Sequence, residues 1–105
     1  MNTIPIDHDS THAAIGRLLD IARSDTGQSR RVANFLLAWW NGPDNGHFEI
    51  ADLFGVDSSI AADITTVIGF LGQHPGAVYI DGLGYRDEIQ DIVARWRDVA
   101  PADAD

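Results

Sequence analysis

Apolar residues recur at helical spacing in the first half of the chain, and this pattern most strongly constrains the fold. Val32, Phe35, Leu36, Trp39 and Trp40 occupy positions i, i+3, i+4, i+7 and i+8, so a helix would place them on one broad face. Such a face must pack against other apolar faces, because the burial of apolar surface drives folding. The stretch therefore predicts a long helix within a multi-helix core.

Three further segments carry apolar stripes of the same period. They lie within residues 14–22, 60–71 and 89–96. Turn-forming residues separate the stripes, and NGPDNG at 41–46 is the densest of these breaks. The predicted helices cover residues 10–24, 27–40, 58–72 and 86–98.

Two shorter elements are predicted between the long helices. Residues 48–54 have room for one or two helical turns. Ala77–Ile80 is β-branched and aromatic enough for a short strand. Asp81 and Gly82 would turn this strand into a small β-hairpin that ends near Tyr85.

The expected fold is mainly α: a single compact domain of about four principal helices with a helix-turn-helix-like corner and room for one short β-hairpin. Ser10 or Thr11 would cap the first helix. We divide the 105 residues into a flexible leader at 1–9, a helical domain at 10–98 and an acidic tail at 99–105. This length suits one domain.

The charge of the chain is acidic and unevenly distributed. The formal net charge is −9, there is no lysine, and all seven bases are arginine. Residues 32–85 contain six acidic residues and no basic one. Such a middle repels phosphate and favours a partner with a basic surface, because the summed field steers association. Solubility alone is the competing explanation for the acidity.

The segment IADLFGVDSSIAADI, residues 50–64, has the spacing of a helix-turn-helix corner. Ala51, Gly55, Val56 and Ile60 fit its packing logic, in which the glycine permits a left-handed turn. The following helix, however, exposes no base that could neutralise phosphate. Three aspartates lie in this segment instead: Asp52, Asp57 and Asp63. The pattern thus predicts a packing corner more strongly than a DNA reader.

Two adjacent pairs in the second predicted helix are candidates for contacts. Arg30 and Arg31 stand near its start, where the helix dipole disfavours cations. They would either clamp a carboxylate or phosphate or pair with surface acids. Trp39 and Trp40 point about 100° apart in a helix, so one can be buried while Trp40 serves as a binding hot spot. The alternative buries both in the core.

The chain carries no recognisable catalytic or cofactor motif. It has no cysteine, and no nucleophile elbow, phosphate loop or HExxH sequence occurs. His8 and His12 have i, i+4 spacing that would chelate a metal if helical, but they fall near the expected flexible leader. We therefore predict no enzyme activity, cofactor or metal. No apolar run is long enough to span a membrane, and no secretory signal begins the chain, so the expected location is the cytoplasm.

Three blocks of the sequence resemble an uncharacterised family of small acidic proteins. These blocks are LLDIARSDTGQSRRVANFLLAWWN, HFEIADLFGVDSSIAADI and LGYRDEI followed by VARW. The family is encoded on integrative elements, plasmids and prophages of proteobacteria, and the resemblance implies a cytoplasmic protein of mobile-element origin. Small acidic proteins from such elements include anti-CRISPR inhibitors, which bind basic nucleic-acid channels of defence complexes. That further step is an analogy.

The leading hypothesis is a non-enzymatic interaction module whose acidic middle engages a protein with a basic surface. Its sharpest form is an inhibitor that occupies the nucleic-acid-binding surface of a host defence complex. The expected partner-binding residues are Asp52, Asp57, Asp63, Glu49, Trp40, Arg30 and Arg31. The alternative is a helix-turn-helix transcriptional regulator. It would hold phosphates with Arg30, Arg31, Arg86, Arg95 and Arg97. Both a monomer and a homodimer remain open.

Overall fold

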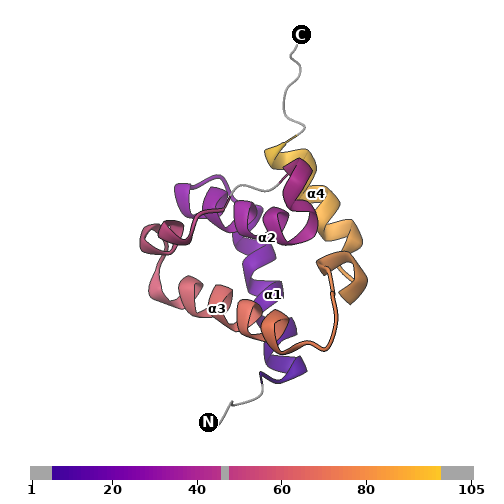
Figure 1. Ribbon diagram of the computed structural model, residues 1–105. Coiled ribbons are helices and arrows are strands. Elements are labelled where there is room, and N and C mark those ends of the chain that lie inside the picture. The colour runs from indigo at the N-terminus through magenta and orange to yellow at the C-terminus, as the bar shows by residue number, and fades with distance from the viewer. Residues whose placement is uncertain (1–5, 46–47, 98–105) are drawn as a thin grey trace.

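The computed structural model describes residues 6–45 and 48–97 and is helical, with no strand in these ranges (Figure 1). This confirms the predicted mainly α domain of about four principal helices. The long helices are α1 (His8–Ala22), α2 (Gly27–Asn45), α3 (Ser58–Gln73) and α4 (Arg86–Trp96). The short 3-10 helices are η1 (Ile50–Gly55) and η2 (Ile80–Leu83). No helix in the described part of the chain is both long and apolar enough to cross a membrane.

Helix α1 is the central element of the fold. It packs against α2, α3 and α4, and α2 also packs against α4 and both short helices. In Figure 1, α1 runs behind the space between α2 and α3. The apolar stripes meet at this centre, and most of the core is contributed by α1 and α2. The buried apolar residues are Ala14, Ile15, Leu18, Leu19, Ala22, Val32, Ala33, Phe35, Leu36, Leu37, Ile60, Ile64, Val67, Ile80, Ile89 and Ile92.

Helix α1 begins two residues earlier than predicted, inside the expected leader at 1–9. Its N-cap is Asp7, whose carboxylate accepts hydrogen bonds from the backbone N–H and the hydroxyl of Ser10, at 2.7 and 2.6 Å. Ser10 and Thr11, the predicted caps, lie within the helix. Thr11 is buried and its hydroxyl donates to the Asp7 carbonyl. The expected acidic tail lies outside the described residues.

Helix α2 extends beyond the predicted end at residue 40. Asn41 has non-helical dihedral angles, with φ −154° and ψ 76°, and the chain then resumes a helical turn that contains Pro43. A proline ring clashes with the preceding turn and lacks an N–H donor, so a helix bends where proline is inserted. The turn-forming residues at 41–45 therefore produce a kink rather than the predicted stop.

The predicted β-hairpin at residues 77–85 is wrong. No strand pairs with this segment in the described chain, and Ile80–Leu83 forms η2 instead. Ile80 is fully buried in the helical core, and Gly84 ends η2 with φ 103°, a conformation that favours glycine. The segment before η2 is held by the Trp39 indole N–H, which donates to the Val78 carbonyl at 2.9 Å.

Candidate interaction surface

The short helix η1 carries the two most exposed large apolar side chains of the described residues. Phe54 is 92% exposed and Ile50 is 73% exposed, and η1 contains no buried residue. Leu53 is the member of this helix that packs against the core. We call Ile50, Phe54 and the flanking acids Glu49 and Asp57 the η1 surface. Two highly exposed apolar side chains in one short helix make η1 the candidate binding site in the described part of the chain.

Two side chains of α2 hold η1 in place. The Arg31 guanidinium lies against Gly55, with Nη1 3.4 Å from the Gly55 carbonyl oxygen, and its Nε lies 3.8 Å from an Asp52 carboxylate oxygen. The Gln28 side-chain oxygen accepts a 2.6 Å hydrogen bond from the N–H of Asp57, the N-cap residue of α3 just after η1. The η1 surface is therefore fixed to α2 rather than attached only by its chain ends.

The glycine in this corner has a different role from the predicted one. Gly84 is the glycine with positive φ in the described ranges, so Gly55 does not make a left-handed turn. A Cβ atom at position 55 would lie 2.4 Å from Arg31 Nε, so glycine makes room for the guanidinium. Ala51 is exposed rather than packed, and the first element is a 3-10 helix. The segment is a corner, but its packing differs from the helix-turn-helix logic.

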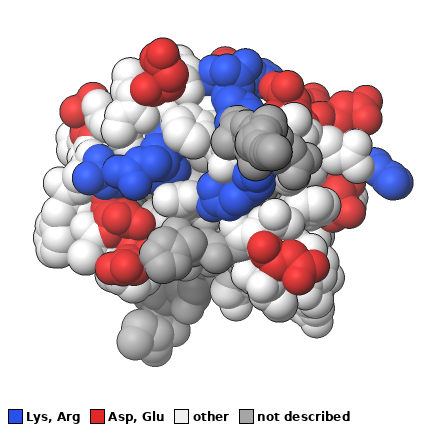
Figure 2. Space-filling view, turned by 90° about the horizontal axis from the view of Figure 1, so that it is seen from above, with Lys and Arg blue, Asp and Glu red and all other residues white. Residues whose placement is uncertain are grey.

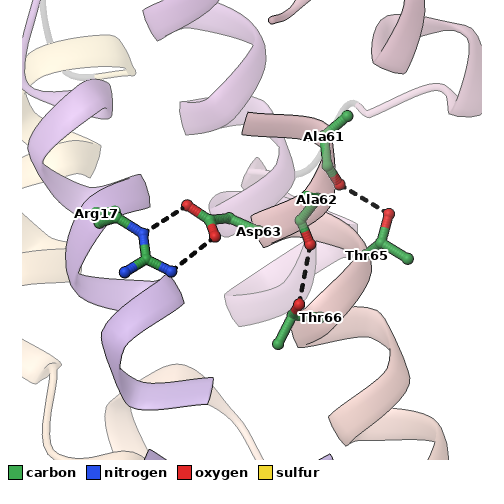
Figure 3. Close-up of polar contacts among 6 residues, drawn as sticks. All are labelled: Arg17, Ala61, Ala62, Asp63, Thr65 and Thr66. Atoms are coloured by element: carbon green, nitrogen blue, oxygen red, sulfur yellow. Dashed lines mark hydrogen bonds and ion pairs between the residues drawn. The ribbon is translucent and has the colours of Figure 1, made fainter. Parts of the chain in front are cut away.

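The predicted partner-binding acids differ in their contacts within the protein. Asp63 is paired with a residue of α1: Arg17 donates two hydrogen bonds of 2.9 Å to its carboxylate (Figure 3). These bonds and the Asp63 charge raise the pKa of Arg17. Asp52 accepts the Glu49 backbone N–H at 3.2 Å and stabilises the start of η1. The Glu49 side chain in turn accepts the Asp52 backbone N–H. Glu49 and Asp57 are both exposed and flank η1 along the chain.

Helix α3 presents no basic residue along its length. The hydroxyl groups of Thr65 and Thr66 donate to the carbonyls of Ala61 and Ala62 one turn earlier, at 2.7 and 2.9 Å (Figure 3). Their protons are therefore used within the helix. With Asp63 bound to Arg17, this helix offers little to a phosphate backbone.

The arginines do not gather into one patch on the face that Figure 2 shows. Basic and acidic side chains are interspersed there. Several arginines also bind within the protein: Arg23 pairs with Asp20 and Asp91 at 3.2 and 3.5 Å. Arg97 donates to the Asn34 side-chain oxygen at 2.6 Å and to a backbone carbonyl. Arg30, by contrast, is exposed.

The two adjacent tryptophans are both half-buried, which lies between the two predicted alternatives. Trp39 and Trp40 pack against the core, and neither is fully buried or fully exposed. Of the seven predicted partner-binding residues, the structure therefore brings Glu49, Asp52, Asp57 and Arg31 together around η1. Asp63 lies on α3 and binds Arg17 of α1 instead.

Sequence reasoning missed the two most exposed apolar residues of the site. Ile50 and Phe54 stand in a segment predicted to form helical turns, where apolar residues are expected to face inward. The one sequence signal for their exposure was the length of the segment, because one or two helical turns are too short to carry a continuous apolar stripe.

Comparisons with known proteins identify a family but not an activity. No curated protein and no solved structure matches the chain. Residues 12–97, most of the chain, match a family of unknown function, DUF7673. This range contains all of α2, η1, α3, η2 and α4 and most of α1. The protein therefore belongs to the DUF7673 family of unknown function.

Proposed function

We propose that the protein is a non-enzymatic interaction module and that the η1 surface is its contact site. The supporting observation is Phe54, which is 92% exposed on a helix that Arg31 and Gln28 hold against α2. Burial of a phenylalanine side chain contributes about 1.5–3 kcal/mol. Phe54 stays exposed in the folded protein, so this free energy becomes available when a pocket of a partner covers the side chain. Because Arg31 and Gln28 hold the backbone around η1, binding would order little of the chain beyond the Phe54 side chain itself.

The chemistry of the partner follows from the residues around the anchor. Glu49 and Asp57 are exposed next to η1, and the chain carries a net charge of −9. Acidic groups at the rim of an apolar contact favour a basic partner, mainly by increasing the association rate. We therefore expect a protein surface that combines an apolar pocket with lysine or arginine around it.

In its sharpest form, the proposal makes this protein an inhibitor that covers a nucleic-acid-binding surface of a host defence complex. Such surfaces are basic because they bind phosphate, so the acidic η1 surface has the complementary charge. The resemblance to small acidic proteins of mobile elements also supports this form, by analogy with anti-CRISPR inhibitors. An inhibitor of this kind would act in the cytoplasm.

A helix-turn-helix DNA reader is the less favoured alternative. Helix α3 carries no base, and Arg31 and Arg97 make contacts within the protein. Arg30, Arg86 and Arg95 remain exposed residues and would have to supply the phosphate contacts. A gel-shift titration tests this alternative, since DNA binding through arginines weakens steeply as salt rises. Absence of binding at low salt would exclude it.

The main test is affinity capture from host lysate with the wild-type chain and Phe54→Ser. Tyr79→Ser is the matched control, because Tyr79 is also an exposed aromatic, at 52%, but lies outside η1. We expect Phe54→Ser to weaken binding of the captured partner by about 30-fold or more, as for an interface hot spot of about 2 kcal/mol. Tyr79→Ser should bind like wild type. Equal capture by wild type and Phe54→Ser would contradict the proposal.

Two further measurements test the charge and the inhibitor form. Combined Glu49→Gln and Asp57→Asn should slow association and reduce its dependence on salt. Added nucleic acid should compete with the protein for the purified partner. A partner that binds equally well in the presence of saturating nucleic acid would remove the inhibitor form and leave the interaction module.

A further inference from the structure

The side chains of His8 and His12 converge at the start of α1, away from the η1 surface. Their Nε2 atoms are 3.3 Å apart, and the ring centroids are separated by 4.4 Å. We propose that these two imidazoles form a chelating site for a borderline first-row divalent cation such as Zn²⁺. This inference is independent of the proposed interaction function.

The distance between the two nitrogens fits a shared cation. Imidazole nitrogen binds Zn²⁺ at about 2.0–2.1 Å in tetrahedral sites, so two such ligands lie about 3.3–3.4 Å apart. The Nε2 atoms of His8 and His12 are already 3.3 Å apart. Zn²⁺ could therefore bind both nitrogens with little change in their separation, which lowers the cost of ordering the ligands.

The backbone beneath the pair is fixed by the cap of α1. Asp7 accepts two hydrogen bonds from Ser10, so the first turn is regular from His8 onward. Residues four apart on a helix lie on the same face, which brings the rings together. The His8 ring is further supported by edge contact with Phe70 of α3, with centroids 6.0 Å apart.

Tyr85 orients the second imidazole. Its hydroxyl oxygen lies 2.5 Å from His12 Nδ1. When Nδ1 carries the proton and donates it to this oxygen, Nε2 is unprotonated and has the lone pair that a metal ligand requires. Hydrogen bonds of this kind set the tautomer and orientation of metal-binding histidines.

The two imidazoles alone do not complete the coordination of a cation. In the described ranges, no group of three histidine, cysteine or acidic side chains converges on a metal position. Water or a ligand from another molecule must therefore complete the coordination, so we expect modest affinity and a preference for zinc, nickel or copper over magnesium.

Calorimetric titration of the full chain with Zn²⁺, in a buffer that does not bind metal, tests the proposal. We expect one saturable site per chain and no response to Mg²⁺, because magnesium prefers oxygen ligands. His8→Ala and His12→Ala should each weaken binding at least about tenfold, since the remaining imidazole loses its intramolecular partner. His74→Ala, which alters a histidine at the end of α3, should bind like wild type.

Tyr85→Phe separates an oriented metal site from a simple pair of histidines. It keeps both imidazoles and removes the hydroxyl that contacts His12 Nδ1, so Zn²⁺ binding should weaken about tenfold. Ring ¹⁵N spectra should show the Nε2 signals of His8 and His12 shifting together as Zn²⁺ is added. No saturable binding by wild type, or equal binding by His8→Ala and wild type, would overturn the proposal. Circular dichroism checks that each variant is folded.

Discussion

The seam between α1 and α2 and the short helix η1 use apolar residues in opposite ways. Leu18 of α1 and Leu36 of α2 are completely buried, whereas Phe54 and Ile50 of η1 face solvent. The seam residues stabilise the fold, whereas the exposed side chains of Phe54 and Ile50 contribute little to it. Apolar character alone therefore does not say which residues hold this protein together and which are available to a partner.

The largest effect is expected in the seam. Leu18→Ala should lower the free energy of unfolding by about 2–5 kcal/mol, because it removes buried methyl groups and leaves a cavity. Denaturant unfolding followed by circular dichroism measures this loss. Ile68→Ala is the control, since Ile68 is an apolar residue of α3 that is 42% exposed, and it should cost much less. Equal losses from both variants would break the comparison.

An intermediate effect is expected at Trp39, which is half-buried. Trp39→Phe removes the indole N–H that donates to the Val78 carbonyl, and we expect a loss of about 1–2 kcal/mol in the free energy of unfolding. Trp40→Phe changes a neighbouring half-buried indole that makes no such bond in the described chain. The same unfolding experiment should show a smaller loss for Trp40→Phe. The reverse order would show that the Val78 contact is not stabilising.

A smaller and pH-dependent effect is expected at the cap of α1. The hydroxyl of Ser10, followed by its backbone N–H, lowers the pKa of Asp7. A carboxyl with a lowered pKa in the folded state stabilises the fold above its unfolded pKa, about 3.9, and this contribution is lost as pH falls through the folded pKa. Asp7→Ala should therefore lower the melting temperature near pH 7, and the difference should shrink below about pH 4.

Thermal melts across this pH range, with Asp9→Ala as the control, provide the measurement. Asp9 is an exposed acid in the same first turn, but Asp7 is the cap. A difference between Asp7→Ala and wild type that stays constant down to pH 2 would contradict the linkage.

The smallest effect on stability is expected in η1. Phe54→Ser should change the free energy of unfolding by no more than about 0.5 kcal/mol, because an exposed side chain loses little on truncation. The same variant is expected to lose partner binding, so stability and function separate at this residue. A loss above about 1 kcal/mol would show that Phe54 packs on the fold and would remove the contrast with the seam.

The long helices could be predicted because each carries its own apolar stripe. Helix α3, for example, spans Ser58–Gln73, against a prediction of 58–72. The start of α1 was less predictable, since Asp7, Ser10 and Thr11 are all acceptable caps. The β-hairpin failed for a different reason: strand preference depends on a partner strand. Here Ile80 is buried among helices instead.

The candidate sites were only partly predictable. Glu49 and Asp57 were predicted as partner-binding acids, and both are exposed, because charge favours solvent. Their role in binding stays a prediction. The bond between Asp63 and Arg17 joins residues 46 positions apart, and no local pattern indicates it. The histidine pair was recognised by spacing but discounted, because the expected leader extended to residue 9, whereas α1 begins at His8.

The sequence alone determined the number of long helices, their approximate bounds, the acidic charge and the absence of a recognisable catalytic motif. These properties depend on composition or on residues a few positions apart. Only the tertiary structure decided that Phe54 is exposed, that Gly55 makes room for Arg31, and that Tyr85 meets His12 across 73 positions. The physical reason is that burial and side-chain approach depend on how helices pack together, whereas helical periodicity is a property of each segment alone.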